Sequence, residues 1–198
     1  MINCLIAGVG GQGTVLASKL IAAAAMEAGM FVRTTETIGM AQRGGSVVSH
    51  VRMGADIHAP LIPLGTADII IAFEPAEAVR ALPLLANGGV IIVCDNAVYP
   101  AASGAYDVQG MAKHLKTAAS SAAANVVIIN GERLLPKCGV KALNVALLGA
   151  AAQCGVFPFD AQAVREAIIT GVPKRFLDMN LNAFDIGGEM YNEAVRAD

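Results

Sequence analysis

The sequence predicts an α/β protein with a Rossmann-like, doubly wound, mostly parallel sheet and a helical C-terminal tail. Three observations support this fold class. Short apolar runs typical of buried parallel strands alternate with longer stretches of helical periodicity. A glycine-rich loop stands between the first apolar run and the first helical stretch. After the last strand pattern, the chain is helical from about residue 141 to its end.

The first elements are expected in the order strand, loop, helix, strand. Residues 2–7 are a short apolar run bounded by glycine. Residues 14–28 follow as an alanine-rich helix, with Gly29 where a left-handed cap belongs. Residues 31–35 resemble a second strand. Together these segments form a βαβ unit, which predicts a right-handed crossover and a parallel sheet.

The remaining elements follow from the same two periodicities. Residues 46–52 alternate like a strand with one wetter face, and a turn follows at residues 54–56. Further strands are expected at residues 67–73, 89–94 and 125–130, and helices at 76–85, 107–123, 141–153, 160–170 and 183–195.

Composition limits the class of protein. At 198 residues the chain is long enough for one domain with a large core. Charged residues make up only 15%, and a surface with so little charge can mean that a partner covers part of it. The 14 basic residues are scattered and the net charge is −2, so we expect no nucleic-acid partner. The longest apolar run, residues 142–156, is interrupted by Asn144 and Gln153 and is too short to span a bilayer.

No leader pattern precedes the first strand, so we expect no membrane partner and a cytoplasmic location. The four cysteines are far apart, without a CxxC pair, and are expected to act as small hydrophobic residues rather than as metal or cluster ligands. They are Cys4, Cys94, Cys138 and Cys154.

The three histidines, His50, His58 and His114, have no serine, cysteine or acidic partner at a recognisable motif spacing. We expect structural or solvated roles for them and nominate no catalytic residue.

The first glycine-rich loop contains Gly8, Gly10 and Gly13 at the G-x-G-x-x-G spacing, with Gly11 and Gln12 between them. Such a loop permits a tight turn and leaves N–H groups free at a helix start for an anionic phosphate. A dinucleotide site also needs an acidic residue after the second strand, and Glu36 is the sole candidate. Three interpretations stay open: a structural turn, an anion or partner contact, and a bound dinucleotide.

A second glycine-rich loop spans residues 37–45 and ends in Gln42-Arg43-Gly44-Gly45. Arg43 offers a planar cation beside bare backbone, which suits a carboxylate, a phosphate or a partner's acidic group. A solvated connecting loop is the alternative. Because this loop follows the second strand of the βαβ unit, we expect it beside the first loop at the carboxyl edge of the sheet.

Both loops carry a family resemblance. The runs GVGGQGTVLASKLIA and ETIGMAQRGGSVVSHVR resemble the gamma-domain family of 2-oxoacid:ferredoxin oxidoreductases. The MAQRGGS version is most similar to the beta subunit of indolepyruvate:ferredoxin oxidoreductases. The segments NVALLGA and PKRFLDMNLNAFDIG are similar to the helical tail of this family, so the resemblance covers essentially the whole chain.

The resemblance implies that residues 1–198 are a single gamma-type domain whose helical tail covers about residues 141–198. It implies the small subunit of an enzyme that oxidatively decarboxylates a 2-oxoacid, such as an aryl pyruvate, forms acyl-coenzyme A and reduces ferredoxin. Thiamine diphosphate and 4Fe–4S clusters would then belong to a large partner subunit, with coenzyme A as co-substrate and no cofactor bound by this chain alone. Ferredoxin would be met through the complex.

For this subunit we expect both loops to face the partner and to contact coenzyme A or the oxoacid. The expected contact residues are Gly8, Gly10, Gly11, Gln12, Gly13, Gln42, Arg43, Gly44 and Gly45. Two alternatives remain: a stand-alone NAD(P)-binding oxidoreductase domain, and a non-catalytic assembly subunit. A homodimer of the isolated chain is also left open.

Overall fold

The computed structural model describes residues 1–38, 44–98 and 107–197. Within these residues one mixed sheet of six strands has the order β2-β3-β1-β4-β5-β6. Strands β1, β4, β5 and β6 pair in parallel, whereas β3 runs antiparallel to both β1 and β2. The strands are β1 (Ile2–Val9), β2 (Val32–Ile38), β3 (Ser46–Met53), β4 (Ala67–Ala72), β5 (Leu85–Cys94) and β6 (Asn125–Ile129).

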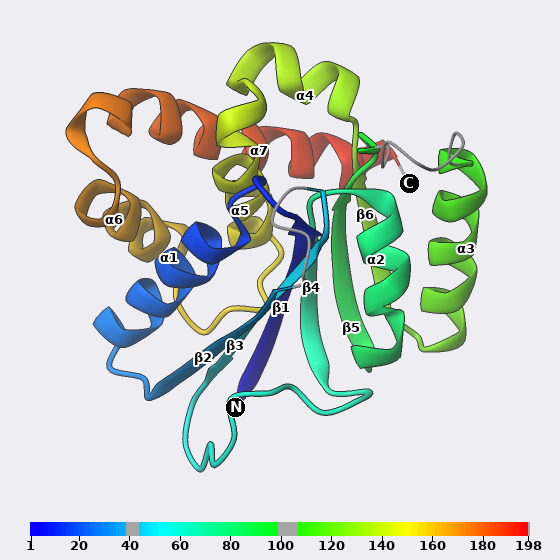
Figure 1. Ribbon diagram of the computed structural model, residues 1–198, viewed down its shortest axis with the longest axis horizontal. Helices are drawn as coiled ribbons and strands as arrows, with labels where there is room; N and C mark the ends of the chain where they lie inside the picture. The colour runs from blue at the N-terminus through cyan, green and yellow to red at the C-terminus, as the bar shows by residue number, and fades with distance from the viewer. Residues whose placement is uncertain (39–43, 99–106, 198) are drawn as a thin grey trace.

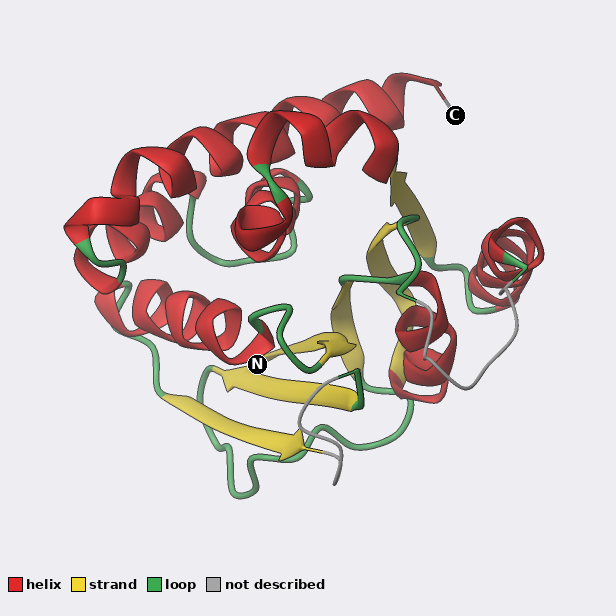
Figure 2. Ribbon diagram, turned by 45° about the horizontal axis from the view of Figure 1, so that its top comes forward, coloured by secondary structure: helices red, strands yellow, loops and turns green. Residues whose placement is uncertain are grey.

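The helices lie on both faces of this sheet (Figures 1 and 2). They are α1 (Thr14–Glu27), α2 (Pro75–Ala81), α3 (Val108–Ser121), α4 (Gly131–Cys138), α5 (Leu143–Gln153), α6 (Ala161–Gly171) and α7 (Leu177–Ala197), with 3₁₀ turns η1 (Leu82–Leu84), η2 (Val140–Ala142) and η3 (Lys174–Phe176). The predicted α/β class with a mostly parallel, doubly wound sheet is confirmed.

The βαβ prediction differs from the structure in one respect. Strands β1 and β2 run in the same direction, but they do not pair with each other, because β3 lies between them and pairs with both. Strand β3 therefore turns the expected parallel pair into a three-stranded mixed unit. The wetter face predicted from the alternation of β3 is absent among the described residues, because its polar residues Ser49, His50 and Arg52 are buried together with its apolar ones.

Three helices also differ from the sequence-based prediction. Helix α7 begins at Leu177 rather than at residue 183. The helix expected at residues 76–85 ends at Ala81, because Pro83 directs the chain into the 3₁₀ turn η1. Helix α4 was not predicted, because its eight residues contain Pro136, which reads as a helix breaker. The Asn130 side chain caps this helix by accepting a hydrogen bond from the backbone N–H of Arg133 at 2.9 Å.

Alternation along each strand divides the interior into two cores. Cys4 and Ile6 of β1 face α1, α5 and α7, whereas Leu5 and Ala7 face α2 and α3. The helices expected as a tail thus form a layer over one face of the sheet. No single described helix is long and apolar enough to cross a membrane, although α4 together with η2 and α5, bent by 98°, meets the criteria of length and composition.

Helices α5 and α7 approach each other closely at two glycines. A Cβ atom at Gly149 would lie 1.9 Å from the carbonyl oxygen of Phe184, and one at Gly187 would lie 1.7 Å from that of Ala146. Both obstacles are backbone atoms, which cannot rotate away. These glycines therefore set the distance at which α7 packs on α5.

Replacing Gly187 with alanine should lower the free energy of unfolding by about 1–3 kcal/mol, because the helices must separate to admit the methyl group. Gly188→Ala is the matched control, since its Cβ would meet only ordinary contacts of 3.4 Å or more and alanine favours the helix. Urea unfolding of both variants measures the difference; equal stability of the two would contradict this account of the packing.

Candidate functional site

The first glycine loop connects β1 to α1 at the carboxyl edge of the sheet. Gly11 and Gly13 adopt positive φ angles of 99° and 83°, a region that other residues rarely occupy. A Cβ at Gly8 would lie 3.0 Å from both Phe73 and Thr14. These three glycines are therefore required by the turn and by its packing, whatever else the loop does.

Three N–H groups at the start of the first loop bind within the protein. The N–H of Val9 donates to Oε1 of Gln12 at 2.7 Å, and the N–H of Gln12 donates back to the carbonyl of Val9 at 3.1 Å. The N–H of Gly10 donates to the carbonyl of Gly45 at 2.9 Å. Gln12 thus stabilises the turn from inside, and the loop differs from a phosphate cradle whose amides all point to a ligand.

The bond between Gly10 and Gly45 joins the two glycine loops. Because Val9 and Ser46 are register partners in β1 and β3, the end of one loop meets the start of the other. The predicted proximity is therefore confirmed for Gly44 and Gly45. Gln42 and Arg43, the other two predicted contact residues, lie outside the described residues.

Asn144 contacts the first loop from α5, although no sequence motif predicted it as a site residue. Its Nδ2 donates to the carbonyl of Gly13 at 3.3 Å, and the residue is only 3% exposed. Oδ1 of Asn144 has no hydrogen-bond partner among the described residues. The available signal was an amide side chain within the longest apolar run of the sequence.

Glu36 does not occupy the position that a dinucleotide site requires. It lies on β2, separated from β1 by the whole width of β3, and two strand spacings amount to about 10 Å. Its Oε1 lies 3.5 Å from the hydroxyl of Ser18 on α1. The inserted strand has thus moved the acidic side chain away from the glycine loop.

A cavity of about 230 Å³ lies at the carboxyl ends of the neighbouring strands β1 and β4. The chain leaves β1 toward α1 on one face of the sheet and leaves β4 toward α2 on the other face. Such a topological switch point is the usual ligand crevice of doubly wound sheets. The residues that line it include Val9, Gly44, Ser46, Glu74, Glu77 and Arg80.

Two buried glutamates give this cavity an acidic wall. Glu74 is 1% exposed; its Oε1 caps α2 by accepting from the N–H of Glu77 at 2.8 Å, but Oε2 has no partner within the described part of the chain. Burial raises the pKa of the Glu74 carboxyl above its ordinary value of 4.5. Both carboxylate oxygens of Glu77 have partners, because one accepts from the Ser46 hydroxyl at 2.5 Å and the other pairs with Arg80. No motif in the sequence marks either glutamate as a site residue.

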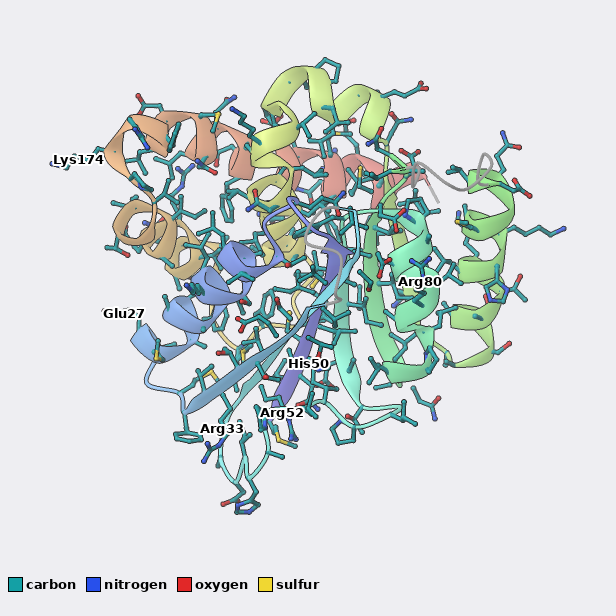
Figure 3. The ribbon with its side chains drawn as sticks, in the orientation of Figure 1. Glu27, Arg33, His50, Arg52, Arg80 and Lys174 are labelled. Carbon is teal, nitrogen blue, oxygen red and sulfur yellow. The ribbon has the colours of Figure 1, made fainter. Side chains whose placement is uncertain are left out.

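The histidines take the structural or solvated positions expected for them. His50 is buried, its Nδ1 accepts from the N–H of Ile62 at 3.3 Å, and burial lowers its pKa. His58 and His114 are exposed. Two large cations, Arg33 and Arg52, lie near the opposite edge of the sheet (Figure 3) and bond to neighbouring loops there.

The cysteines do not fit an iron–sulfur cluster. Cys4 lies in β1, Cys94 ends β5, Cys138 ends α4 and Cys154 follows α5. Burial raises the pKa of each thiol, to about 12 for Cys94, whereas a cluster ligand must be a thiolate. Among the described residues there is also no group of three or more histidine, cysteine or acidic side chains that could hold a metal ion.

Known proteins are similar to this chain over nearly its whole length. The family described as pyruvate ferredoxin/flavodoxin oxidoreductase matches residues 3–190. Indolepyruvate oxidoreductase subunit IorB of Archaeoglobus fulgidus is 40% identical over 200 residues, which cover 98% of this chain and 96% of the relative.

Two solved structures share the fold. The gamma subunit of a keto/oxoacid ferredoxin oxidoreductase from Geobacter sulfurreducens has a TM-score of 0.69 at 24% identity, covering 98% of this chain and 100% of that one. The 2-oxoglutarate:ferredoxin oxidoreductase of Magnetococcus marinus has a TM-score of 0.70 at 20% identity, covering 97% of this chain but 31% of that one. The same fold thus also occurs as one part of a longer chain.

The buried carboxyl of Glu74 predicts a pH-dependent stability. A carboxyl whose pKa is raised by folding favours the folded state below pH 4.5, and this contribution is lost as the pH rises through the raised pKa. Glu74→Gln keeps the capping oxygen and cannot ionise. The free energy of unfolding of this variant minus that of the wild type should therefore be larger at pH 7.5 than at pH 4. The increase should be about 1.4 kcal/mol for each pH unit by which folding raises the pKa of Glu74.

Urea unfolding at both pH values measures this change, with Glu189→Gln on the exposed side of α7 as the control. If Glu74→Gln lowered the free energy of unfolding at pH 7.5 as much as at pH 4, or more, folding would not raise the pKa of Glu74.

Proposed function

We infer the function from the premise that this chain belongs to the pyruvate ferredoxin/flavodoxin oxidoreductase family, as the small subunit of a 2-oxoacid:ferredoxin oxidoreductase. The resemblance predicted from the two glycine loops is thereby confirmed. We propose that the substrate is indolepyruvate or another aryl pyruvate, converted to acyl-coenzyme A with reduction of ferredoxin. The name and 40% identity of the archaeal relative support this substrate class.

We propose that thiamine diphosphate and the 4Fe–4S clusters reside in a large partner subunit. Side chains alone cannot carry out the one-electron chemistry of such a decarboxylation, so a cofactor must supply it. Burial raises the pKa of all four thiols of this chain, which does not suit the thiolate ligands of a cluster, and the sequence contains no Gly-Asp-Gly thiamine signature. A cytoplasmic location accords with free cysteines.

We propose that residues 1–198 act as one gamma-type domain that presents its two glycine loops to this partner. The observation that supports this role is the bond between Gly10 and Gly45, which joins the loops into a single surface at the carboxyl edge. In this proposal Gly8 and residues 10–13 shape the surface, and residues 42–45, Arg43 above all, contact coenzyme A or the oxoacid carboxylate.

A specific observation favours a second candidate, in which the loops serve assembly alone. The N–H groups of Val9, Gly10 and Gln12 are already bonded within the protein, and the neighbouring cavity has an acidic wall that disfavours a diphosphate. A stand-alone NAD(P) site is disfavoured by the same features and by the position of Glu36.

The substrate proposal is tested by reconstituting the chain with the large subunit and measuring ferredoxin reduction with a panel of 2-oxoacids and coenzyme A. We expect kcat/KM for indolepyruvate to exceed that for pyruvate and 2-oxoglutarate by at least about tenfold, or 1.4 kcal/mol of transition-state binding. A preference for pyruvate or 2-oxoglutarate would reject the aryl substrate.

Arg43→Ala distinguishes the two roles of the loops. A lost charge-assisted contact to coenzyme A or the oxoacid should raise the corresponding KM by about tenfold or more while assembly is preserved. Lys174→Ala, an exposed cation on η3 (Figure 3), is the control. Weaker association with unchanged KM in the assembled enzyme would instead support the assembly role.

A further inference from the structure

The cavity at the switch point is lined by a buried carboxyl group, one oxygen of which has no hydrogen-bond partner among the described residues. Three charged side chains line it: Glu74, Glu77 and Arg80. Arg80 pairs with Glu77, whose other oxygen accepts from the Ser46 hydroxyl, so this glutamate is compensated. Oε1 of Glu74 accepts from the backbone N–H of Glu77, while Oε2 is buried without a partner among the described residues.

Helix capping does not explain this carboxylate. Capping α2 requires one acceptor oxygen, and serine, threonine, asparagine or aspartate supplies it with a shorter side chain. The second oxygen of Glu74 is surplus to the cap and costs free energy, because a buried carboxylate lacks its hydration. Burial accordingly raises the pKa of this carboxyl. The unpaired Oε2 can accept a hydrogen bond from a donor that another molecule supplies.

The rest of the lining indicates the shape of that donor. Apolar Val9 and Val98 and the bare backbone of Gly44 accompany the charged groups. A basic side chain combines an aliphatic stem, which suits the apolar lining, with a charged head that bonds carboxylate oxygens. A free metal ion is less suitable, because no set of three candidate ligands exists within the described residues.

We propose that this cavity receives the guanidinium or ammonium group of a basic side chain from the large subunit, which bonds Oε2 of Glu74. The inference rests on the proposed function, in that it takes the chain to assemble with such a subunit. The occurrence of this fold as 31% of a longer chain supports a protein neighbour as the source. Among the described residues, Glu77 and Arg80 are the other charged groups that line the cavity.

Two substitutions test the proposal: one removes an acidic side chain from the cavity and the other removes a basic one. Affinity of the separately purified subunits is measured by titration calorimetry at pH 7.5. Glu74→Gln should weaken association by about 30-fold or more, because it removes one partner of a buried charge pair. Arg80→Gln should tighten the association severalfold. Removing the Arg80 cation eliminates a competitor and leaves Glu77 free to attract the same basic group. Glu189→Gln should leave the affinity unchanged.

The isolated variants provide a second readout. Glu74→Gln should be at least as stable as the wild type while binding more weakly, which separates a docking role from a folding defect. Unchanged affinity of Glu74→Gln, or weakening by Arg80→Gln instead, overturns the cationic occupant but leaves the proposed function intact. Failure of the wild-type subunits to associate overturns both.

A third measurement addresses the source of the cation. Arginine or magnesium chloride at millimolar concentration is added to the isolated chain, and the unfolding temperature is recorded. We expect the same small change for the wild type and for Glu74→Gln. Stabilisation of the wild type alone would identify a free cation as the occupant and would overturn the proposal.

Discussion

The pairing of β3 with both β1 and β2 determines the arrangement of the carboxyl edge. An antiparallel strand starts at the edge where its parallel neighbours end, so Ser46 lies beside Val9. The backbone of Gly45 therefore reaches Gly10 and bonds it. The same strand separates β2 from β1 and so moves Glu36 away from the glycine loop. One pairing both joins the two loops and removes the acidic group that a dinucleotide would need.

The carboxyl edge combines several internal hydrogen bonds with two buried polar atoms that lack partners in the described part of the chain. Gln12 and Gly45 accept hydrogen bonds from the N–H groups of Val9 and Gly10. The absence of a Cβ at Gly8 and Gly13 admits Phe73 and Asn144. Against this background, Oδ1 of Asn144 and Oε2 of Glu74 stand out as unbonded. Buried polar atoms without partners reduce stability, and proteins tolerate them most often where a partner or ligand supplies the missing bond.

Much of the fold could be predicted from local patterns. Apolar strands, alanine-rich helices and the caps Asp107 and Asp160 follow from propensity and periodicity, which act over a few residues. The unpredicted helix α4 contains Pro136, a residue whose effect depends on its position in the turn. The close approach of α5 and α7 was also invisible, because Gly149 and Gly187 are far apart in sequence and act only as a pair across the helix interface.

The sequence by itself determined the α/β class, the two glycine loops and the family, because each depends on residues that are contiguous or nearly so. Tertiary structure alone decided that β3 lies between β1 and β2, that Asn144 supports Gly13, and that Glu74 and Glu77 line the cavity beside Gly44. These relations join segments many residues apart, and strand pairing and burial, rather than local propensity, bring them together. The burial that leaves an oxygen of Glu74 unpaired is likewise a property of the assembled layers, because an isolated glutamate in the chain would be hydrated.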